Sequence, residues 1–132
     1  MADPGTFQCS VVTPERAVLE CEAKFVALPA WDGEVGILRN RGPLLCRLGI
    51  GSLRIETPTE NHVMFVDGGF AEMAENKLTV LTSAARLPEE LNREEIARSA
   101  EAARGMEVRD DPSFKARQDA LQRVRAQKKL VR

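Results

Sequence analysis

The chain has 132 residues, of which 43% are hydrophobic and 30% are charged, and its formal net charge at pH 7 is −1. This length allows one domain, or one domain with an appended segment, and the small net charge excludes the strong positive field of a protein that binds nucleic acid over its whole surface. The apolar runs span only a few residues each and the first five residues match no signal or transit peptide, so the sequence predicts a cytosolic globular protein without a membrane span.

The N-terminal part of the chain consists of short apolar runs that predict β-strands. In residues 7–12, the apolar side chains of Phe7, Cys9 and Val11 alternate with polar ones, which is the period of two of a half-buried strand. A turn with an early proline follows. Two further short apolar runs cover residues 17–22 and 24–28.

Residues 31–45 contain three glycines and one proline, yet keep apolar pairs that tie them to a core. Asp32-Gly33 is a turn dipeptide, because glycine adopts positive φ without steric cost. Pro43 lacks a backbone donor, so the next strand is expected to begin after it. We therefore predict a kinked β-corner, which is either an ordinary turn or a contact surface. Its charged side chains belong to Glu34, Arg39 and Arg41.

The middle of the chain predicts more strands at close spacing. Residues 44–56 form a β-like segment in which two glycines indicate a bulge or bend between two strands. Residues 62–66 and 70–74 are separate strands interrupted by Asp67-Gly68-Gly69, and a two-residue turn at Glu75-Asn76 returns the chain antiparallel. Residues 6–82 therefore hold about eight to ten short strands and no helix, the signature of an antiparallel β-sandwich or barrel.

The sequence pattern changes at Pro88. Residues 88–104 predict a helix with two glutamates in its first turn and Arg104 in its last, followed by Gly105 as the C′ residue. Asp110 and an early proline predict a second helix from Phe114 to about Leu130. Together they form an antiparallel two-helix hairpin. We divide the chain into a β-domain, residues 1–86, and a helical segment, residues 87–132.

The inward face of this hairpin is thin. Helix one offers Ile96, Ala100 and Ala103; helix two offers Ala116, Ala120, Val124 and Val131, with Phe114 and Leu121 close to that face. Burial stabilises a fold by about 25 cal/mol per Å² of apolar surface, and these small side chains bury little surface. The hairpin is therefore expected to pack against the β-domain or a partner. Residues 113–132 carry seven basic groups and one acidic group, Asp119, and an anionic partner would offset the repulsion among them.

No pattern predicts a catalytic residue, a cofactor or a metal site. The glycine pairs at 33–36 and 49–51 lack the residues that complete a phosphate-binding loop, and His62 is the only histidine. Cys9, Cys21 and Cys46 lie in apolar runs without C-x-x-C spacing, which favours buried reduced thiols over a disulfide framework.

Two stretches in a fixed order carry a resemblance to a known family. The first is Gly33-Glu-Val-Gly-Ile-Leu followed by Gly42-Pro-Leu-Leu45. The second is Val63-Met-Phe-Val-Asp-Gly-Gly-Phe-Ala-Glu-Met followed by Asn76-Lys-Leu-Thr-Val-Leu81, ahead of an alanine-rich helical hairpin. In this order they resemble the epsilon subunit of F-type ATP synthases, called delta in mitochondria. The resemblance covers nearly the whole chain and implies a β-sandwich followed by a helix-turn-helix.

The resemblance also implies a function. Members of this family are non-catalytic rotor subunits of the central stalk, which couple proton-driven rotation to the catalytic sector. In bacteria they are peripheral to the inner membrane, on its cytoplasmic side. Its sandwich binds the gamma subunit and the c-ring, and its helices contact the beta and alpha subunits and regulate ATP hydrolysis. Candidate contacts with gamma and the c-ring are Trp31, Glu34, Arg39, Asn40 and Arg41. Candidate contacts with beta are Arg117, Arg123, Arg125, Lys128 and Lys129.

The sequence departs from the family pattern at several positions. Arg41 replaces a common histidine, Arg39 a frequent proline, and Asp67 the serine of an S-G-G motif. Members that bind ATP carry an Asp and an Arg where this chain has Asn92 and Glu95, and a carboxylate repels phosphate, so we expect no ATP binding.

An alternative hypothesis is a free-standing β-sandwich adaptor whose basic tail binds nucleic acid or an anionic surface. The acidic β-domain, with 8 basic and 11 acidic groups in residues 1–87, argues against nucleic acid. The basic groups also lack a neighbouring aromatic platform on which bases would stack.

Overall fold

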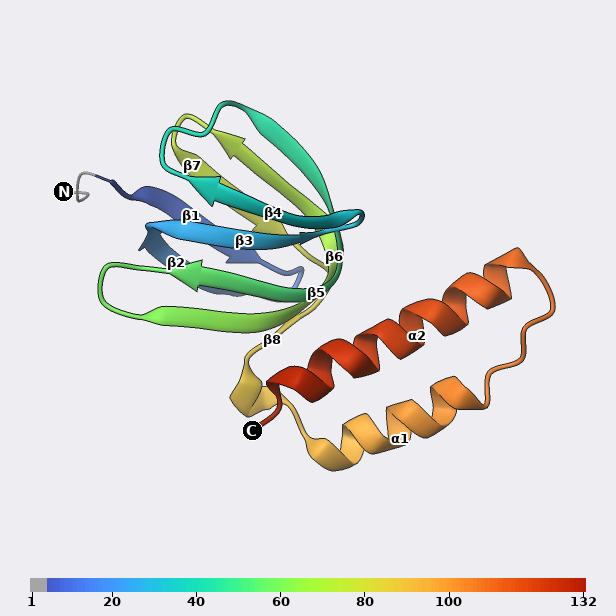
Figure 1. Cartoon of the computed structure of the whole chain (residues 1–132). Coiled ribbons are helices and arrows are strands. Elements are labelled where there is room, and N and C mark those ends of the chain that lie inside the picture. The colour runs from blue at the N-terminus through green and yellow to red at the C-terminus, as the bar shows by residue number, and fades with distance from the viewer. Residues whose placement is uncertain (1–4) are drawn as a thin grey trace.

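A computed structural model of the chain describes residues 5–132. These residues form eight strands, one short 3₁₀ helix and two α-helices (Figure 1). The strands are β1 (Phe7–Val12), β2 (Ala17–Ala23), β3 (Phe25–Ala30), β4 (Gly33–Leu38), β5 (Leu44–Glu56), β6 (Asn61–Ala74), β7 (Lys77–Leu81) and β8 (Ala85–Arg86). The helices are η1 (Pro88–Glu90), α1 (Arg93–Arg104) and α2 (Asp111–Leu130).

The two longest strands, β5 and β6, pass through both layers of a sandwich and bend near their middles (Figure 1). One layer has the order β2-β1-β7-β6-β5 and uses the C-terminal half of β6 and the N-terminal half of β5. The other layer joins the remaining halves to β3, β4 and β8. The predicted β-sandwich is confirmed. Among the strand pairs of the described residues, β1 and β7 alone run parallel.

Glycines allow these bends, and here one sequence prediction is wrong. The pattern predicts a strand break at Asp67-Gly68-Gly69 and two strands within residues 44–56, yet β5 and β6 stay paired in a single register. Gly68 and Gly69 have φ of 68° and 109°, which side chains rarely allow, so the ladder turns without ending. Two strands are therefore 13 and 14 residues long instead of short.

The core lies between the two layers. β1 contributes Phe7, Cys9 and Val11, as the period of two predicts. The other strands contribute large side chains with almost no exposed surface: Val26, Leu28, Ile37, Leu53, Ile55, Met64, Met73, Leu78 and Val66. Burying each such side chain contributes roughly 1.5–3 kcal/mol, so this cluster is the main source of the sandwich's stability.

Several predicted turns are confirmed. Trp31 and Asp32 connect β3 to β4, and β5 begins directly after Pro43. Glu75 and Asn76 connect β6 to β7 with φ of 51° and 60°. Positive φ at both residues is the geometry of a two-residue hairpin turn, which fixes the register of the two strands.

The first α-helix is shorter than predicted. After η1 the backbone is extended at Leu91 and Asn92, and α1 begins at Arg93. The Asn92 side chain accepts hydrogen bonds from the backbone N–H groups of Glu94 (2.8 Å) and Glu95 (3.1 Å). Such an N-cap needs non-helical backbone, which ends the preceding turn. Gly105 directly follows the last helical residue, Arg104, as the sequence predicts, and its φ of −84° is right-handed.

The second helix is capped as the sequence predicts, although it starts earlier. Asp110 is the N-cap, and its carboxylate accepts a 2.9 Å hydrogen bond from the Ser113 backbone N–H. This hydrogen bond lowers the pKa of Asp110 below its usual value, so the cap is ionised at neutral pH. The helix begins at Asp111, three residues before the predicted start.

The two helices pack around a small cluster of Ile96, Ala100 and Val124, with Leu91 and Val131 at its edge. Phe114 and Ala116, expected near this face, are exposed. α2 is 20 residues long and α1 only 12, so the first turn of α2 extends past the end of α1 (Figure 1). The thin hairpin leans on the sandwich through α2, which contacts β5 and β6.

Candidate functional site

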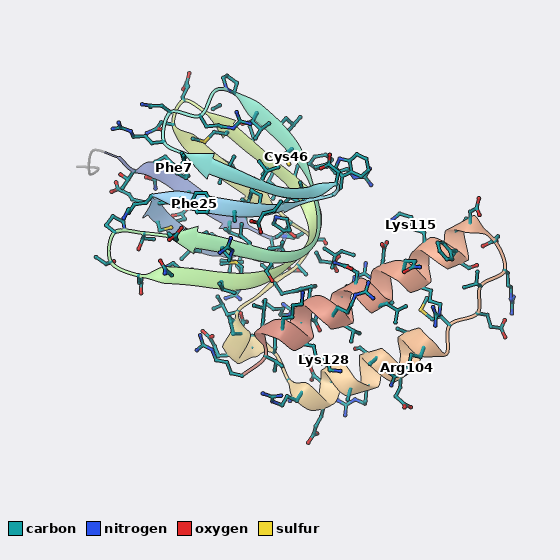
Figure 2. The ribbon with its side chains drawn as sticks, in the orientation of Figure 1. Phe7, Phe25, Cys46, Arg104, Lys115 and Lys128 are labelled. Atoms are coloured by element: carbon teal, nitrogen blue, oxygen red, sulfur yellow. The ribbon has the colours of Figure 1, made fainter. Side chains whose placement is uncertain are left out.

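A cleft of about 1090 Å³ lies between α2 and the bent part of the sandwich. Figure 2 shows side chains of α2 projecting into this space, with Lys115 near the start of the helix. Cationic side chains outnumber acidic ones along it. The cations are Arg47, Lys115, Arg123, Arg125 and Lys129; the acids are Glu34, Asp67 and Asp119.

Two contacts cross the floor of this cleft and hold the hairpin against the sandwich; we call them the α2 latch. Arg123 Nε donates to Asp67 Oδ2 at 2.9 Å, and Gln122 Nε2 donates to the Ile50 carbonyl at 3.2 Å. Both partners on the sandwich lie at the bends of β5 and β6. The Arg123–Asp67 ion pair is partly buried, so dissolved salt screens it less than it screens a pair on the surface.

Asp67 is held in place by the segment that follows β7. Its backbone N–H donates to Thr82 Oγ1 (3.3 Å) and to the Ala84 carbonyl (3.1 Å). Its own carbonyl accepts from Ser83 Oγ at 2.6 Å. The carboxylate that faces Arg123 therefore projects from a rigid bend.

Replacing Arg123 with glutamine is expected to loosen the hairpin. Loss of a partly exposed ion pair costs about 1 kcal/mol, roughly a fivefold shift toward the undocked hairpin. Hydrogen exchange of α2 amides, measured on the full chain, should accelerate. Arg117→Gln is the control, because Arg117 lies on the same helix but outside the cleft. Equal acceleration in both variants would contradict a role for the latch.

A second surface, the apolar face, covers the outer side of one sandwich layer. Leu45, Phe70 and Leu81 are 71%, 52% and 54% exposed. Phe70 lies directly opposite Leu81 on β7 and opposite Arg47 on β5. Large apolar side chains grouped on adjacent strands indicate a protein contact more strongly than scattered ones.

The sequence candidates for gamma and c-ring contacts do not form one patch. Trp31 and Glu34 lie at the β3–β4 turn and line the cleft. Arg39, Asn40 and Arg41 lie at the other end of β4, roughly 17 Å away at 3.3 Å per residue. There the Asn40 backbone N–H donates to Asn76 Oδ1 at 2.8 Å. The backbone N–H of Trp31 donates to the Arg47 carbonyl at 3.1 Å, which ties the β3–β4 turn to β5.

The five basic candidates on α2 are divided between its sides. Arg123, Arg125 and Lys129 line the cleft. Arg117 and Lys128 are not among its lining residues. Arg123 is engaged in the α2 latch, so it becomes available to another anion only when the hairpin undocks.

Asn92 and Glu95 lie at the start of α1, outside the cleft. The Asn92 side chain is occupied as the N-cap, and Glu95 is exposed in the first turn, where the helix dipole favours a negative charge. Both residues therefore have structural roles in this chain.

Replacing Asn92 with alanine is expected to destabilise α1 by about 1 kcal/mol, the usual cost of losing an N-cap side chain. Amide exchange in α1 should accelerate about fivefold. Asn92→Asp should retain protection, since a carboxylate caps equally well and suits the helix dipole. Unchanged exchange in the alanine variant would show that the cap does not stabilise α1.

Two observations bear on chemistry and on membrane insertion. Within residues 5–132 the structure gathers no set of three His, Cys, Asp or Glu side chains that could hold a metal ion. Across the same residues, no helix combines the length and apolar character needed to cross a membrane.

Cys9 is buried, as predicted, whereas Cys21 and Cys46 are only half-buried.

Sequence reasoning missed the apolar face and the α2 latch. One signal was present: alternation places Phe70 on the same side of β6 as Glu72, which must face solvent. No local signal linked Asp67 to Arg123, because 56 residues separate them.

The architecture defines a class of protein: a β-sandwich with its own core, a docked helical hairpin, and apolar and cationic outer surfaces suited to contacts with other subunits. Comparisons narrow this class. The family model of the ATP synthase Delta/Epsilon chain, β-sandwich domain, matches residues 6–88.

Curated relatives cover almost the whole chain. It is 39% identical over 127 residues to the ATP synthase epsilon chain of Rhodopirellula baltica, which covers 96% of this chain and 99% of the relative. It is 38% identical over 124 residues to the epsilon chain of Symbiobacterium thermophilum, with 93% and 84% covered. The chain belongs to the ATP synthase epsilon chain family, which confirms the resemblance. It is a non-catalytic subunit of the central stalk of an F-type ATP synthase.

Solved structures share the fold at lower identity. A chain of the Euglena gracilis mitochondrial ATP synthase (OSCP/F1/c-ring, rotational state 1) is 20% identical, with a TM-score of 0.83 over 98% of this chain and 83% of that chain. A chain of the Tetrahymena thermophila mitochondrial ATP synthase, central stalk/c-ring, is 15% identical, with a TM-score of 0.71 over 98% of both chains.

Proposed function

We propose that the sandwich connects the gamma subunit to the c-ring, so that proton-driven rotation of the ring reaches the catalytic sector. The observation that carries this proposal is the apolar face. Leu45, Phe70 and Leu81 stand on a sandwich whose core is already complete, so these side chains are free to pack against a partner. The assembly would be peripheral to the bacterial inner membrane, on its cytoplasmic side.

The composition of the apolar face fits a subunit interface. An aromatic side chain stands at its centre, with Arg47 and Glu72 beside it on β5 and β6. Interfaces concentrate their binding energy in such central aromatic and aliphatic residues, with charged residues toward the rim. We assign this face to gamma. The loop with Arg39, Asn40 and Arg41, at the opposite end of β4 from Trp31 and Glu34, would contact gamma or the c-ring.

The hairpin would regulate ATP hydrolysis. Its own core is small and the α2 latch is the main polar attachment, so docked and undocked positions differ by little free energy. In the undocked position, Arg117, Arg123, Arg125, Lys128 and Lys129 would meet acidic surface on the beta and alpha subunits. The Asn92 cap and the Glu95 carboxylate support regulation without bound ATP.

Binding to gamma tests the central proposal. The purified chain and the gamma subunit should elute together from a gel-filtration column at micromolar concentrations and in moderate salt. An apolar contact should survive added salt, because screening weakens charges and not hydrophobic burial. Absence of a complex would contradict the proposal. Binding to nucleic acid that disappears with salt would favour the basic-tail adaptor.

Deleting residues 88–132 should leave a folded β-domain that still binds gamma. The sandwich core draws on β1 to β8, with Leu87 packed against it, and needs no residue of α1 or α2. Thermal unfolding followed by circular dichroism should remain cooperative, and gel filtration should still show the complex. An unfolded product would contradict the division of the chain at residues 86 and 87.

A further inference from the structure

Two cysteines on neighbouring strands face each other. Cys9 on β1 and Cys21 on β2 are directly opposite in the register of this antiparallel pair. Side chains of opposite residues lie on the same side of the sheet, with Cβ atoms about 4.5–5.5 Å apart. A disulfide needs a Cβ separation of about 3.5–4.5 Å, so a small closing movement joins these thiols without any change of register. Both are free thiols in this structure.

The two thiols have different surroundings. Cys9 has no exposed surface, whereas Cys21 is half-buried on β2, the last strand of its layer. Interaction with the Cys21 thiol and burial raise the pKa of Cys9. Interaction with the Cys9 thiol lowers the pKa of Cys21, although burial and the charge of Glu60 oppose this. Cys21 is thus the member of the pair that ionises first and that a reagent reaches first.

Cys46 differs from both. It lies on β5, opposite Ala71 and with no cysteine beside it. Burial and the nearby charge of Asp32 raise the pKa of its thiol. It serves as an internal reference within the same chain.

We propose that Cys9 and Cys21 form an oxidisable dithiol, which closes to a disulfide across β1 and β2 by exchange with a low-molecular-weight disulfide such as glutathione disulfide. The Cys21 thiolate attacks one sulfur of the small disulfide, forms a mixed disulfide and releases one thiolate. Cys9 then loses its proton and attacks the Cys21 sulfur, which releases the second thiolate. Two protein thiols are oxidised and one small disulfide is reduced to two thiols.

The consequence is mechanical. β2 pairs with β1 alone, so it is an edge strand held only by this ladder. The disulfide would hold β2 to β1 from the core side of the layer, since Cys9 points into the core. The apolar face lies on the outer side of the same layer, so oxidation should leave gamma binding intact while it slows opening of the β1–β2 hairpin.

Peptide mapping tests the proposal, because trypsin places each cysteine in its own peptide: the peptide that ends at Arg16, residues 17–24 and residues 42–47. The folded full-length chain is incubated with glutathione disulfide, free thiols are alkylated, and the digest is analysed without reduction. We expect a linked pair of the first two peptides, while Cys46 remains alkylated. Amide exchange in β1 and β2 should slow in the oxidised chain.

Variants test the order of attack. Cys9→Ser should accumulate the mixed disulfide of glutathione on Cys21, because no second thiol resolves it. Cys21→Ser should leave Cys9 unmodified, and Cys46→Ser should form the same linked pair as the unaltered chain. The proposal is overturned if Cys46 reacts first, if disulfides form only between chains, or if the linked pair appears only after unfolding by denaturant. The peptide map of the unaltered chain tests whether the Cys9–Cys21 disulfide forms, even if one variant does not fold.

Discussion

Replacing Gly69 with alanine is expected to lower the free energy of unfolding by at least about 3 kcal/mol, which shifts the melting temperature by roughly 10 °C. A Cβ at this position would lie 2.0 Å from the Leu81 carbonyl oxygen and 2.8 Å from the Thr82 Cα. The residue also has a φ of 109°, which an alanine adopts only with strain. Either β7 moves away from β6 or the bend straightens, and both changes open the core.

Gly42→Ala is the matched control. Gly42 has no atom within 4 Å of a Cβ built on it and lies in the exposed loop before β5. Alanine there should change stability by less than about 0.5 kcal/mol. Thermal or urea unfolding of the two variants side by side measures the difference. Equal stability of both variants would show that the β6 bend tolerates a side chain.

Replacing Phe70 with glutamate is expected to weaken binding to gamma about 100-fold, which corresponds to about 3 kcal/mol. The aromatic ring stands between Leu81 and Arg47 at the centre of the apolar face. A carboxylate there would lose its water on assembly without gaining a partner. Because the ring is 52% exposed in the free chain, folding should change by less than about 1 kcal/mol. Titration calorimetry with purified gamma measures the affinity.

Phe114→Glu separates this effect from a general loss of apolar surface. Phe114 is 51% exposed, almost the same as Phe70, but it lies on the first turn of α2. Its replacement should leave the affinity for gamma unchanged within a factor of about two. Equal weakening in both variants would indicate a general effect of lost apolar surface, and no weakening in either would remove the apolar face from the interface.

The sequence predicted the strands better than it predicted how they join. The alternation around Phe7, the turn at Glu75-Asn76 and the cap at Asp110 are local signals, and all three appear in the structure. The bends of β5 and β6 were mistaken for strand breaks. Whether a glycine ends a strand or bends it depends on whether the partner strand bends at the same place, and no local pattern contains that information.

The interaction surfaces were harder to predict for two reasons. The family resemblance drew attention to charged loop residues such as Arg39 and Arg41, and the structure places them far from Trp31 and Glu34. The apolar face arises from strands that are distant in sequence, so Leu45, Phe70 and Leu81 become neighbours only after the sheet forms. The α2 latch likewise depends on where the hairpin docks.

The parallel pairing of β1 with β7 has a consequence for synthesis on the ribosome. β1 finds its first partner, β2, within a few residues, but its second partner spans Lys77–Leu81, nearly seventy residues later. Contacts of such sequence separation form slowly. While the chain is being translated, one side of β1 therefore stays without its strand partner until β7 has left the exit tunnel. The pairing that joins the first strand to nearly the last can therefore form only late in synthesis.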